Sequence, residues 1–492
     1  MCGQETALRA LAILFCASSF EKIGFVYTKA QRLLLSTFFH NSATRIHLTL
    51  GYAMSQRNNH AISENIALLI LSFALSDVPQ SIKWRKSATA RIHEILKDQF
   101  YSDGSYSQQS FNYQRLATLT LIMALEFYPN RLSHHLKQTL NKTVSASIDF
   151  LKSFNNPVDG TLPNFGANDG SITLPLWASD FSDYRPLFRY EEARHRLHSQ
   201  LKPDAYDELF HWFGHNTPPS KPKHENRDTI STLGTRTGYW ISKSSNSEVF
   251  LKSPLLLEHR PSQEDFLAIH LRWNDEDIAI DPGTYSYNAP PPWDHGLAHG
   301  HQHNTCSPND SSFLKKKGRF LWTHWPKADT RCLINRPHCQ RWEFSLQSTN
   351  TPRFIHRRIV DHRNGAVFVF DECKGDHLQT LLHWNLKALD WVEEPQKDIF
   401  FLKRERLFLQ VRSNSPMQIK SHSANKDNVK GWYSPWYGLK EPCLSYDFIC
   451  KNDEDVRFVT VLNEKGSQPY IDDAANLWLE QGILYSETPI ND

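Results

Sequence analysis

Arg57-Asn58-Asn59-His60 and, further along, Gln109-Ser110-Phe111-Asn112-Tyr113 are two polar stretches that each open an apolar run, at 62–75 and 113–127. In both runs apolar residues recur at three- and four-residue spacing, which is typical of buried helices. Asn59 and Tyr113 lie 54 residues apart, about one helical hairpin. The two helices are therefore expected to begin at the same end of a helical domain, where a Tyr beside an Asn amide and a His makes a workable acid/base group.

The hydrophobic period divides the chain into two halves. Residues 1–212 predict helices, with further periodic runs at 6–18, 88–97 and 134–151, and Ser110 or Asn112 as the cap of the helix that carries Tyr113. Residues 213–230, rich in Pro and charge, predict a linker. From 231 to 492 the period becomes two, with turns such as Asn364-Gly365, which predicts an antiparallel β-sandwich. The expected fold class is α+β with several domains.

Composition excludes several classes of function. The net charge of +2 gives no global sign of nucleic-acid binding. No apolar run reaches the roughly 18–20 residues of a membrane span, and the run at 7–20 predicts a core helix because no basic segment precedes it. The eight Cys include no Cys-x-x-Cys pair, so free thiols are expected. The chain also lacks phosphate-loop, serine-hydrolase and zinc-protease motifs.

Five motifs in order resemble those of the heparinase II/III-like polysaccharide lyases. They are Asn58-Asn59-His60 with Glu64, Asp103-Gly104-Ser105 through Tyr113, Asn168-Asp169-Gly170, Asp281-Pro282-Gly283-Thr284-Tyr285, and His303-Asn304-Thr305. The resemblance implies an (α/α) toroid, incomplete because its first part is missing, followed by the β-sandwich. It also implies an acidic, uronate-containing glycan as substrate, cleaved at the cleft between the two domains, and a location in the periplasm or cell envelope, although no signal peptide is visible.

β-Elimination at a uronic acid needs a group that neutralises the carboxylate, a base for the C5 proton and an acid for the leaving oxygen. The resemblance assigns the first role to Asn59 and the proton transfers to Tyr113. His60 and Gln109 are expected to assist or to contact sugar. Asn168, Asp169 and the flat ring of Trp293 are the other expected substrate contacts. The alternative is that these polar groups only form a buried capping network at two helix starts.

The β half carries candidate metal ligands. In some family members a His, a later Asp and the His of the His-Asn-Thr motif hold a structural metal, which here predicts one Zn²⁺ on Asp281 and His303. The first His is absent, since Gln263 stands in its place, and Glu264 is the expected substitute. On a strand, His299, His301 and His303 would share one face, where His and Asp side chains could hold zinc. Two alternatives stay open: ordinary hydrogen-bonding histidines without a metal, or His303 in the cleft as a second acid/base group.

Three functions remain at this stage. The first is a polysaccharide lyase. The second is a glycan-binding, catalytically impaired relative, because part of the toroid and one metal ligand are missing. The third is a glycoside hydrolase that uses two carboxylates, with Asp103, Asp169 and Glu64 as candidates. A polyanionic substrate also needs local positive charge, for which 315–319 and 353–358 are the basic stretches.

Overall fold

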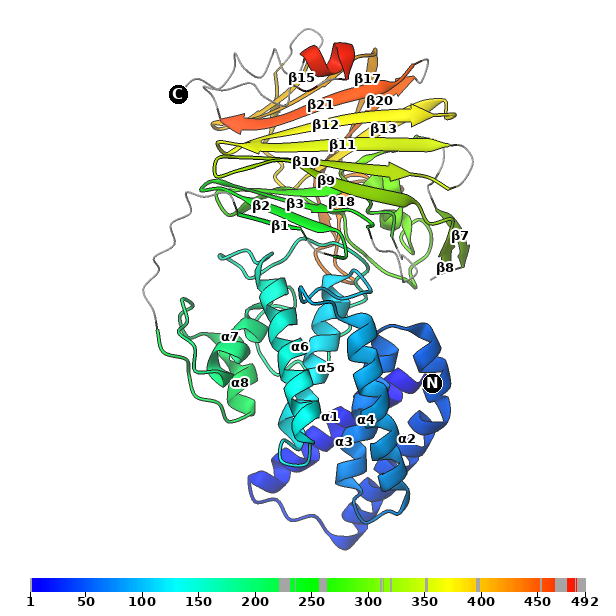
Figure 1. Cartoon of the computed structure of the whole chain (residues 1–492), viewed down its shortest axis with the longest axis vertical. Helices are drawn as coiled ribbons and strands as arrows, with labels where there is room; N and C mark the ends of the chain where they lie inside the picture. The colour runs from blue at the N-terminus through cyan, green and yellow to red at the C-terminus, as the bar shows by residue number, and fades with distance from the viewer. Residues whose placement is uncertain are drawn as a thin grey trace. The chain divides into compact units, whose positions relative to one another are not determined.

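The computed structural model consists of two compact units (Figure 1). Unit 1 comprises Met1–Asn155, Asp159–Leu162 and Gly170–Lys223, and unit 2 comprises Asn156–Val158, Pro163–Asp169 and His224–Asp492. The structure describes residues 2–220, 231–234, 236–255, 263–309, 312, 314–318, 321–349, 353–394, 399–451, 454–464, 476–482 and 484. Most of the expected linker, from residue 221 to 230, lies outside these described residues.

Unit 1 is built from helices, as the first half of the sequence predicts. They are α1 (Gly3–Lys22), α2 (Lys29–Gln56), α3 (Asn59–Ala74), α4 (Gln80–Gln99), α5 (Phe111–Phe127), α6 (His134–Lys152), α7 (Arg185–Arg194), the short 3-10 helix η1 (Ala205–Asp207) and α8 (Glu208–Trp212). The five predicted runs correspond to α1, α3, α4, α5 and α6. α2, α7 and α8 were not among them.

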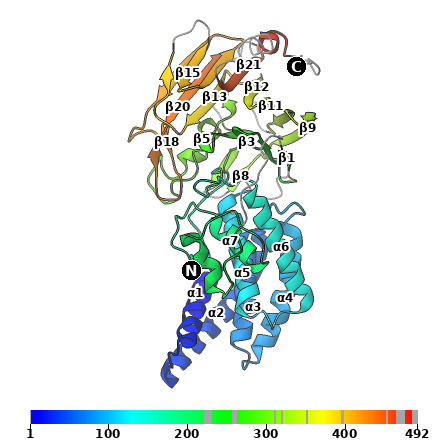
Figure 2. The ribbon, with the colours of Figure 1, turned by 90° about the vertical axis from the view of Figure 1, so that its left-hand side faces the viewer.

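α3 is the central helix of unit 1. Between Asn59 and Phe73, every side chain except that of His60 is buried, and the helix packs against α1, α2, α4 and α5 (Figure 2). The other helices bury one stripe each, because their apolar residues recur at three or four positions, as Ala43, Ile46 and Leu50 do in α2. In α1 the same spacing buries Ala7, Ala10, Leu11 and Leu14, which confirms a core helix at this position. Within the described chain, no helix has the length and apolar character needed to cross a bilayer.

Unit 2 is built around two large antiparallel sheets. The first, nine strands among the described residues, has the order β1 (Ser231–Gly234), β2 (Tyr239–Lys243), β3 (Ser247–Lys252), β4 (Ala268–Trp273), β5 (Glu276–Ala279), β13 (Gln379–Leu386), β20 (Leu444–Lys451) and β17 (Met417–His422), with β6 (Cys306–Pro308) on β13. The second, eight strands, has the order β14 (Val392–Glu393), β15 (Phe400–Arg404), β16 (Leu407–Ser413), β21 (Val456–Glu464), β12 (Ala366–Gly375), β11 (Phe354–Arg363), β10 (Cys339–Gln347) and β9 (Lys327–Arg336). Two small ribbons pair β7 (Lys315–Gly318) with β8 (Leu321–Thr323), and β18 (Trp432–Tyr433) with β19 (Glu441–Pro442).

One apolar core fills the space between the two large sheets. Leu251, Trp384 and Phe448 contribute to it from the first sheet, and Val360 and Phe458 from the second. Side chains on a strand alternate between faces, so each sheet supplies every second residue to this core. The expected antiparallel sandwich after a helical domain is thereby confirmed.

A segment that precedes the linker in sequence packs with unit 2. The Asn164 side chain donates to the backbone oxygen of Ser434 at 2.5 Å, and the Gly166 N–H donates to Asp265 at 2.9 Å. These bonds hold part of the loop at 155–186 against the sandwich.

The histidine run at 299–303 is not a strand. His301 lies in the 3-10 turn η3 (Gly300–Gln302), which follows η2 (Gly296–Ala298), and His299 and His303 flank η3. The Gly300 N–H donates to the buried Glu264 carboxylate at 3.0 Å and so fixes the chain where the second turn begins. The expectation that His299, His301 and His303 share one strand face is therefore wrong.

Candidate active site

The structure brings the two polar stretches of unit 1 together. The backbone N–H of Asn59, at the start of α3, donates to Oε1 of Gln108 at 3.3 Å. The hydroxyl of Tyr106 donates to the same oxygen at 3.4 Å. Gln108 lies in the turn that leads into α5, so this amide links the N-termini of the two helices.

Both helices begin with a side-chain cap. The Asn58 side chain accepts from the His60 N–H at 3.0 Å, and the Ser110 hydroxyl accepts from the Tyr113 N–H at 3.2 Å. Of the two expected caps for α5, Ser110 is the cap, whereas Asn112 lies inside the helix and is buried. Gln109 just before the cap has a positive φ of 52°. Few non-glycine residues adopt that conformation, and such positions are often found at functional sites.

The four candidate residues of unit 1 differ in exposure. Asn59 and Gln109 are buried, whereas His60 and Tyr113 are half-buried. His60 Nδ1 lies 3.8 Å from the Glu64 carboxylate, one helical turn further along α3. Tyr113 and His60 thus retain access to solvent, as a proton-transferring group requires.

Arg115 is not a neighbour that activates Tyr113. Its guanidinium is buried, donates to Asn112 at 3.1 Å and to the backbone oxygen of Phe181, and stacks 4.4 Å from the ring centre of Tyr184. This agrees with the expectation from helical geometry that Arg115 and Tyr113 point apart.

Two of the three candidate hydrolase carboxylates serve local structure. Asp103 accepts from the Ser105 N–H at 3.0 Å and from its hydroxyl at 2.6 Å, which shapes the turn before α5. Glu64 is 1% exposed and is packed closely against Gly3 of α1. The third candidate, Asp169, belongs to unit 2. No observation here favours a hydrolase.

In unit 2, Asp281 and His303 form a buried pair. Nδ1 of His303 lies 2.8 Å from Oδ2 of Asp281, and His303 is completely buried. Burial favours the neutral ring, but the adjacent Asp281 carboxylate outweighs it and raises the pKa of His303. The other Asp281 oxygen accepts from the Gly283 N–H at 3.0 Å. The predicted proximity of these two residues is confirmed, and His303 does not line the pocket described below.

Glu264 does not complete a metal site with this pair. Its carboxylate accepts from the Gly300 N–H at 3.0 Å, the Leu314 N–H at 2.8 Å and the Ser312 hydroxyl. Burial opposes ionisation of Glu264, but the hydrogen bonds it receives lower its pKa. Among the described residues, Glu264, Asp281 and His303 are not a group whose ligand atoms lie within 4.8 Å of one another. The carboxylate instead holds three loop segments together.

The residues after His303 anchor the sheets. The Asn304 amide donates to the backbone oxygens of Ile269 at 2.9 Å and Ile280 at 3.0 Å, and its oxygen accepts from the Asn385 N–H at 2.7 Å. Gln263, in place of the missing His, donates from Nε2 to the Thr284 hydroxyl at 2.7 Å. These side chains hold the loop backbone in place, and their hydrogen bonds do not indicate a catalytic role.

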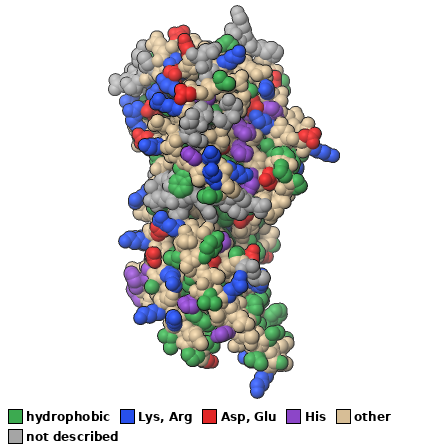
Figure 3. Space-filling view, turned by 90° about the vertical axis from the view of Figure 1, so that its right-hand side faces the viewer, with side chains coloured by type: hydrophobic (Ala, Val, Ile, Leu, Met, Phe, Trp, Pro, Cys, Tyr) green, Lys and Arg blue, Asp and Glu red, His purple; other side chains and the backbone are tan. Residues whose placement is uncertain are grey.

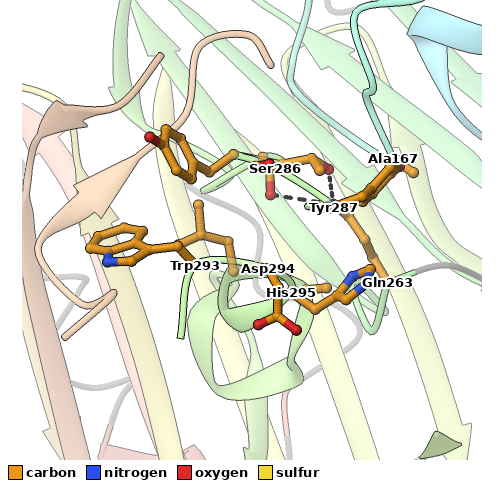
Figure 4. A pocket seen from close by; sticks show the side chains of 12 residues that line it. Ala167, Gln263, Ser286, Tyr287, Trp293, Asp294 and His295 are labelled. Carbon is orange, nitrogen blue, oxygen red and sulfur yellow. Dashed lines mark hydrogen bonds between the residues drawn. The ribbon is translucent and has the colours of Figure 1, made fainter. Parts of the chain in front are cut away.

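An aromatic pocket lies in the same unit (Figure 4). It is lined by Trp293, Asp294, His295, Tyr285, Tyr287, Gln263 and their neighbours. The Lys440 ammonium sits 3.2 Å from the ring centre of the half-buried Trp293 and 4.9 Å from that of Trp432. The sequence analysis predicted Trp293 as a substrate contact. It did not predict Lys440 or Trp432, because they follow about 140 residues later and belong to no motif.

Asn168 and Asp169 lie on the loop that packs with unit 2. Asn168 is buried, and its backbone N–H donates to the Thr284 hydroxyl at 3.2 Å. Asp169 is half-buried. Their expected contact with substrate stays a prediction, as does their meeting with Asn59 and Tyr113.

The two basic stretches differ in how exposed and how paired their side chains are. Lys315, Lys316 and Lys317 are exposed on β7, and Arg319 lies outside the described residues. Within 353–358, by contrast, Arg358 is fully buried and paired with Asp371, and Arg357 is paired with Glu343. The second stretch is therefore not a free basic surface. Figure 3 shows Lys, Arg and His side chains side by side on one face of unit 2.

The chain matches two family models that together cover most of its length. Residues 24–194 match the heparinase II/III N-terminus, and residues 227–461 match the heparinase II/III-like C-terminal domain. The chain belongs to the heparinase II/III-like family. This confirms the resemblance carried by the five sequence motifs.

Relatives within the heparinase II/III-like family share the fold at low identity. A heparin-sulfate lyase of Bacteroides thetaiotaomicron is 20% identical over 372 residues, which cover 72% of this chain and 49% of the relative. The crystal structure of heparinase III matches with a TM-score of 0.64 and 17% identity, over 88% of this chain and 65% of that one. The heparan sulfate lyase of Pedobacter heparinus matches with a TM-score of 0.60 and 17% identity, over 90% and 65%. The chain thus spans about half of the curated relative and less than two thirds of the solved chains.

Proposed function

We propose that this chain is a polysaccharide lyase that cleaves an acidic, uronate-containing glycan of the glycosaminoglycan class by β-elimination. The observation that carries the proposal is the junction at Asn59 and Gln108, where the polar starts of α3 and α5 lie together in unit 1. Membership of the heparinase II/III-like family supports it, as do relatives named heparin-sulfate and heparan sulfate lyase.

Tyr113 is the proposed proton-transfer residue. Its ring is half-buried at the third position of α5, where Ser110 fixes the backbone through the Tyr113 N–H. The phenol takes the C5 proton, returns a proton to the leaving O4, or does both in turn. The polarised N–H groups of a helix start lower the cost of negative charge nearby, which favours a phenolate and an anionic substrate.

Asn59 is the proposed partner of the substrate carboxylate. Its amide donates hydrogen bonds to the carboxylate and stabilises the enolate-like state that follows loss of the C5 proton. His60 and Gln109 flank it as further donors to sugar or carboxylate. Asn59 keeps a fixed backbone position, since Gln108 accepts its N–H.

The aromatic pocket of unit 2 is a proposed subsite for sugar. Trp293 offers a flat half-buried ring, and Lys440 adds a positive charge beside it. A glycan that carries carboxylate or sulfate suits this combination better than a neutral one. Asn168 and Asp169 are kept as proposed substrate contacts, and cleavage in a cleft between the two domains stays a prediction.

An ultraviolet screen of the purified full chain against heparan sulfate, heparin, chondroitin sulfate and alginate tests the proposal. A lyase releases an unsaturated uronide that absorbs in the ultraviolet, together with new reducing ends. New reducing ends without that absorbance would indicate a hydrolase, and retention on immobilised glycan without product would indicate a binding protein. Either result would overturn the proposed lyase activity.

A further inference from the structure

Three potential metal ligands from both large sheets meet in the core of the sandwich. They are Cys306 on β6, His356 on β11 and Cys373 on β12, and all three are completely buried. Their ligand atoms lie within 4.8 Å of one another. β6 belongs to the first sheet, whereas β11 and β12 belong to the second, so the group spans the space between the sheets.

Strand register explains how the second sheet places its donors. His356 lies directly opposite Cys373 in the antiparallel pair of β11 and β12. Two residues further along β11, Arg358 lies opposite Asp371. Side chains two apart on a strand share a face, so all four point into the same core.

The His356 ring is oriented as a metal ligand would be. Its Nε2 lies 2.7 Å from Oδ1 of Asp371, and the Asp371 carboxylate is itself held by Arg358 at 2.6 and 3.0 Å. A carboxylate accepts a proton, so this contact places the ring proton on Nε2 and leaves the lone pair on Nδ1. His356 Nδ1 is buried and forms no hydrogen bond within the usual distances, although the Cys306 thiol lies near enough to act on the ring. The ring nitrogen that remains available is thus the one that a metal would use.

We propose that Cys306, Cys373 and His356 bind one Zn²⁺ between the two sheets. Thiolate and imidazole donors favour zinc over magnesium or calcium, which prefer oxygen. Two thiolates and a neutral imidazole cancel the charge of a divalent ion, which suits an apolar core. Binding releases the two thiol protons to solvent. Among the described residues no fourth His, Cys, Asp or Glu joins the group, so the protein supplies three of the ion's ligands.

The proposed ion fastens one sheet to the other. It is built from residues other than Asp281 and His303, and it needs no glycan and no catalytic step. Its role is structural, because every protein ligand is buried in the core that holds the sandwich together. The inference therefore stands or falls separately from the proposed lyase activity.

X-ray absorption of the full chain, purified under reducing conditions and loaded with zinc, tests the inference without any mutation. The expected result is about one zinc per chain, with two sulfur neighbours at about 2.3 Å and a nitrogen at about 2.0 Å. A shell of nitrogen and oxygen alone would place the ion elsewhere, for example on Asp281 and His303. Absence of bound zinc, or a disulfide between Cys306 and Cys373 in the reduced preparation, would also overturn it.

Variants locate the ion by residue. Cobalt replaces zinc in such sites, and thiolate ligation gives it an intense near-ultraviolet band. Cys306→Ser and Cys373→Ser should each weaken that band, and His356→Gln should lower cobalt affinity. Cys443→Ser is the matched control, because Cys443 is another buried thiol of unit 2 that is not in the group. An unchanged spectrum in both ligand Cys variants would refute the assignment.

A fourth variant tests the carboxylate behind the ligand. Asp371→Asn keeps the shape of the side chain and removes the charge that orients His356. Metal affinity is expected to fall by about 10- to 100-fold, the usual effect of losing such a partner. Competition with a chromophoric chelator measures it. Unchanged affinity in Asp371→Asn would mean that His356 does not bind the metal through Nδ1.

Discussion

Nδ1 of His303 lies 2.8 Å from Oδ2 of Asp281 in the buried interior of unit 2. Both residues come from the motifs that pointed to the family, and among the described residues no third metal ligand joins the pair. The contact orders the loops on either side, because Asp281 also accepts from the Gly283 N–H. In this chain each of the two side chains is the hydrogen-bond partner of the other.

Asp281→Asn should destabilise unit 2. The variant retains shape but leaves the buried His303 without its counter-charge, and removing one partner of a buried charge pair costs about 3–5 kcal/mol. Denaturant unfolding of parent and variant at the same pH measures the difference. Asp294→Asn is the control, since Asp294 lines the aromatic pocket and is half-buried. Equal unfolding free energies for parent and Asp281→Asn would show that the pair contributes little to stability.

Tyr113→Phe should abolish most turnover and leave the fold intact. The variant removes one hydroxyl from a half-buried ring and keeps the Ser110 cap, which uses the backbone. Loss of a positioned acid/base group costs about 10²–10⁴-fold in turnover. Turnover and melting temperature are measured on the same preparation.

Tyr190→Phe provides the matched control for that substitution. Tyr190 is a buried tyrosine of the same unit, whose hydroxyl donates to Glu126 at 2.6 Å. Its loss should lower stability by about 1.5–3 kcal/mol, since the acceptor is charged, while turnover per folded molecule stays unchanged. A Tyr113→Phe enzyme that melts normally and retains parental turnover would remove Tyr113 from the mechanism.

Asn59→Ala should act on catalysis more than on stability. The backbone bond to Gln108 survives, but the transition state loses an amide donor, at a cost of about 2.7–4 kcal/mol by analogy with oxyanion donors. Asn65→Ala is the control on the same helix, because that buried amide donates to the Ala61 backbone oxygen at 2.8 Å and to the Met54 sulfur at 3.5 Å. If Asn59→Ala instead lowers the melting temperature and the activity in parallel, as we expect for Asn65→Ala, the Asn59 amide serves only the capping network at the helix start.

Trp293→Ala should weaken substrate binding without slowing the chemical step. The ring carries Lys440 on one face and lies 5.5 Å from the Tyr285 ring. Loss of one stacking ring is expected to cost about 0.5–1.5 kcal/mol, seen as a higher KM at constant kcat. Trp273→Phe, in the sandwich core, is the contrasting change and should affect stability only. A fall in kcat at constant KM would contradict the subsite.

Sequence periodicity located most of unit 1 but missed the short helices α7 and α8 and the long helix α2. Its buried stripe of Phe39, Ala43 and Ile46 follows helical spacing, yet Leu34, Leu48 and Tyr52 are exposed on the same helix and blur the pattern. The starts of α3 and α5 were predictable because capping residues signal them locally. The contacts within unit 2 were less predictable from the sequence. Lys440 lies beside Trp293, and Cys306 beside His356, only because segments far apart in the sequence come together in the fold. The spacing of residues along the chain does not indicate such contacts.

His362 makes the stability of unit 2 depend on pH. The ring is buried between the hydroxyls of Ser242, at 2.7 Å, and Ser247, at 2.8 Å. Burial lowers the pKa of His362 to about 4, and Glu248, the charged group that acts on it, offsets this only in part. In the unfolded chain the pKa is about 6.5. The neutral ring therefore contributes stability that is fully present above about pH 6.5.

As the pH falls from about 6.5 to about 4, the unfolded chain binds a proton that folded His362 does not. The free energy of unfolding should drop by up to about 1.4 kcal/mol per pH unit from this residue. His362→Gln should be less stable at neutral pH, because its hydrogen bonds change, and should show a shallower decline. His338→Gln, in the exposed turn between β9 and β10, should leave the parental slope in place. Denaturant unfolding at several pH values compares the three proteins. A His362→Gln slope as steep as that of the parent would assign the acid sensitivity to other groups.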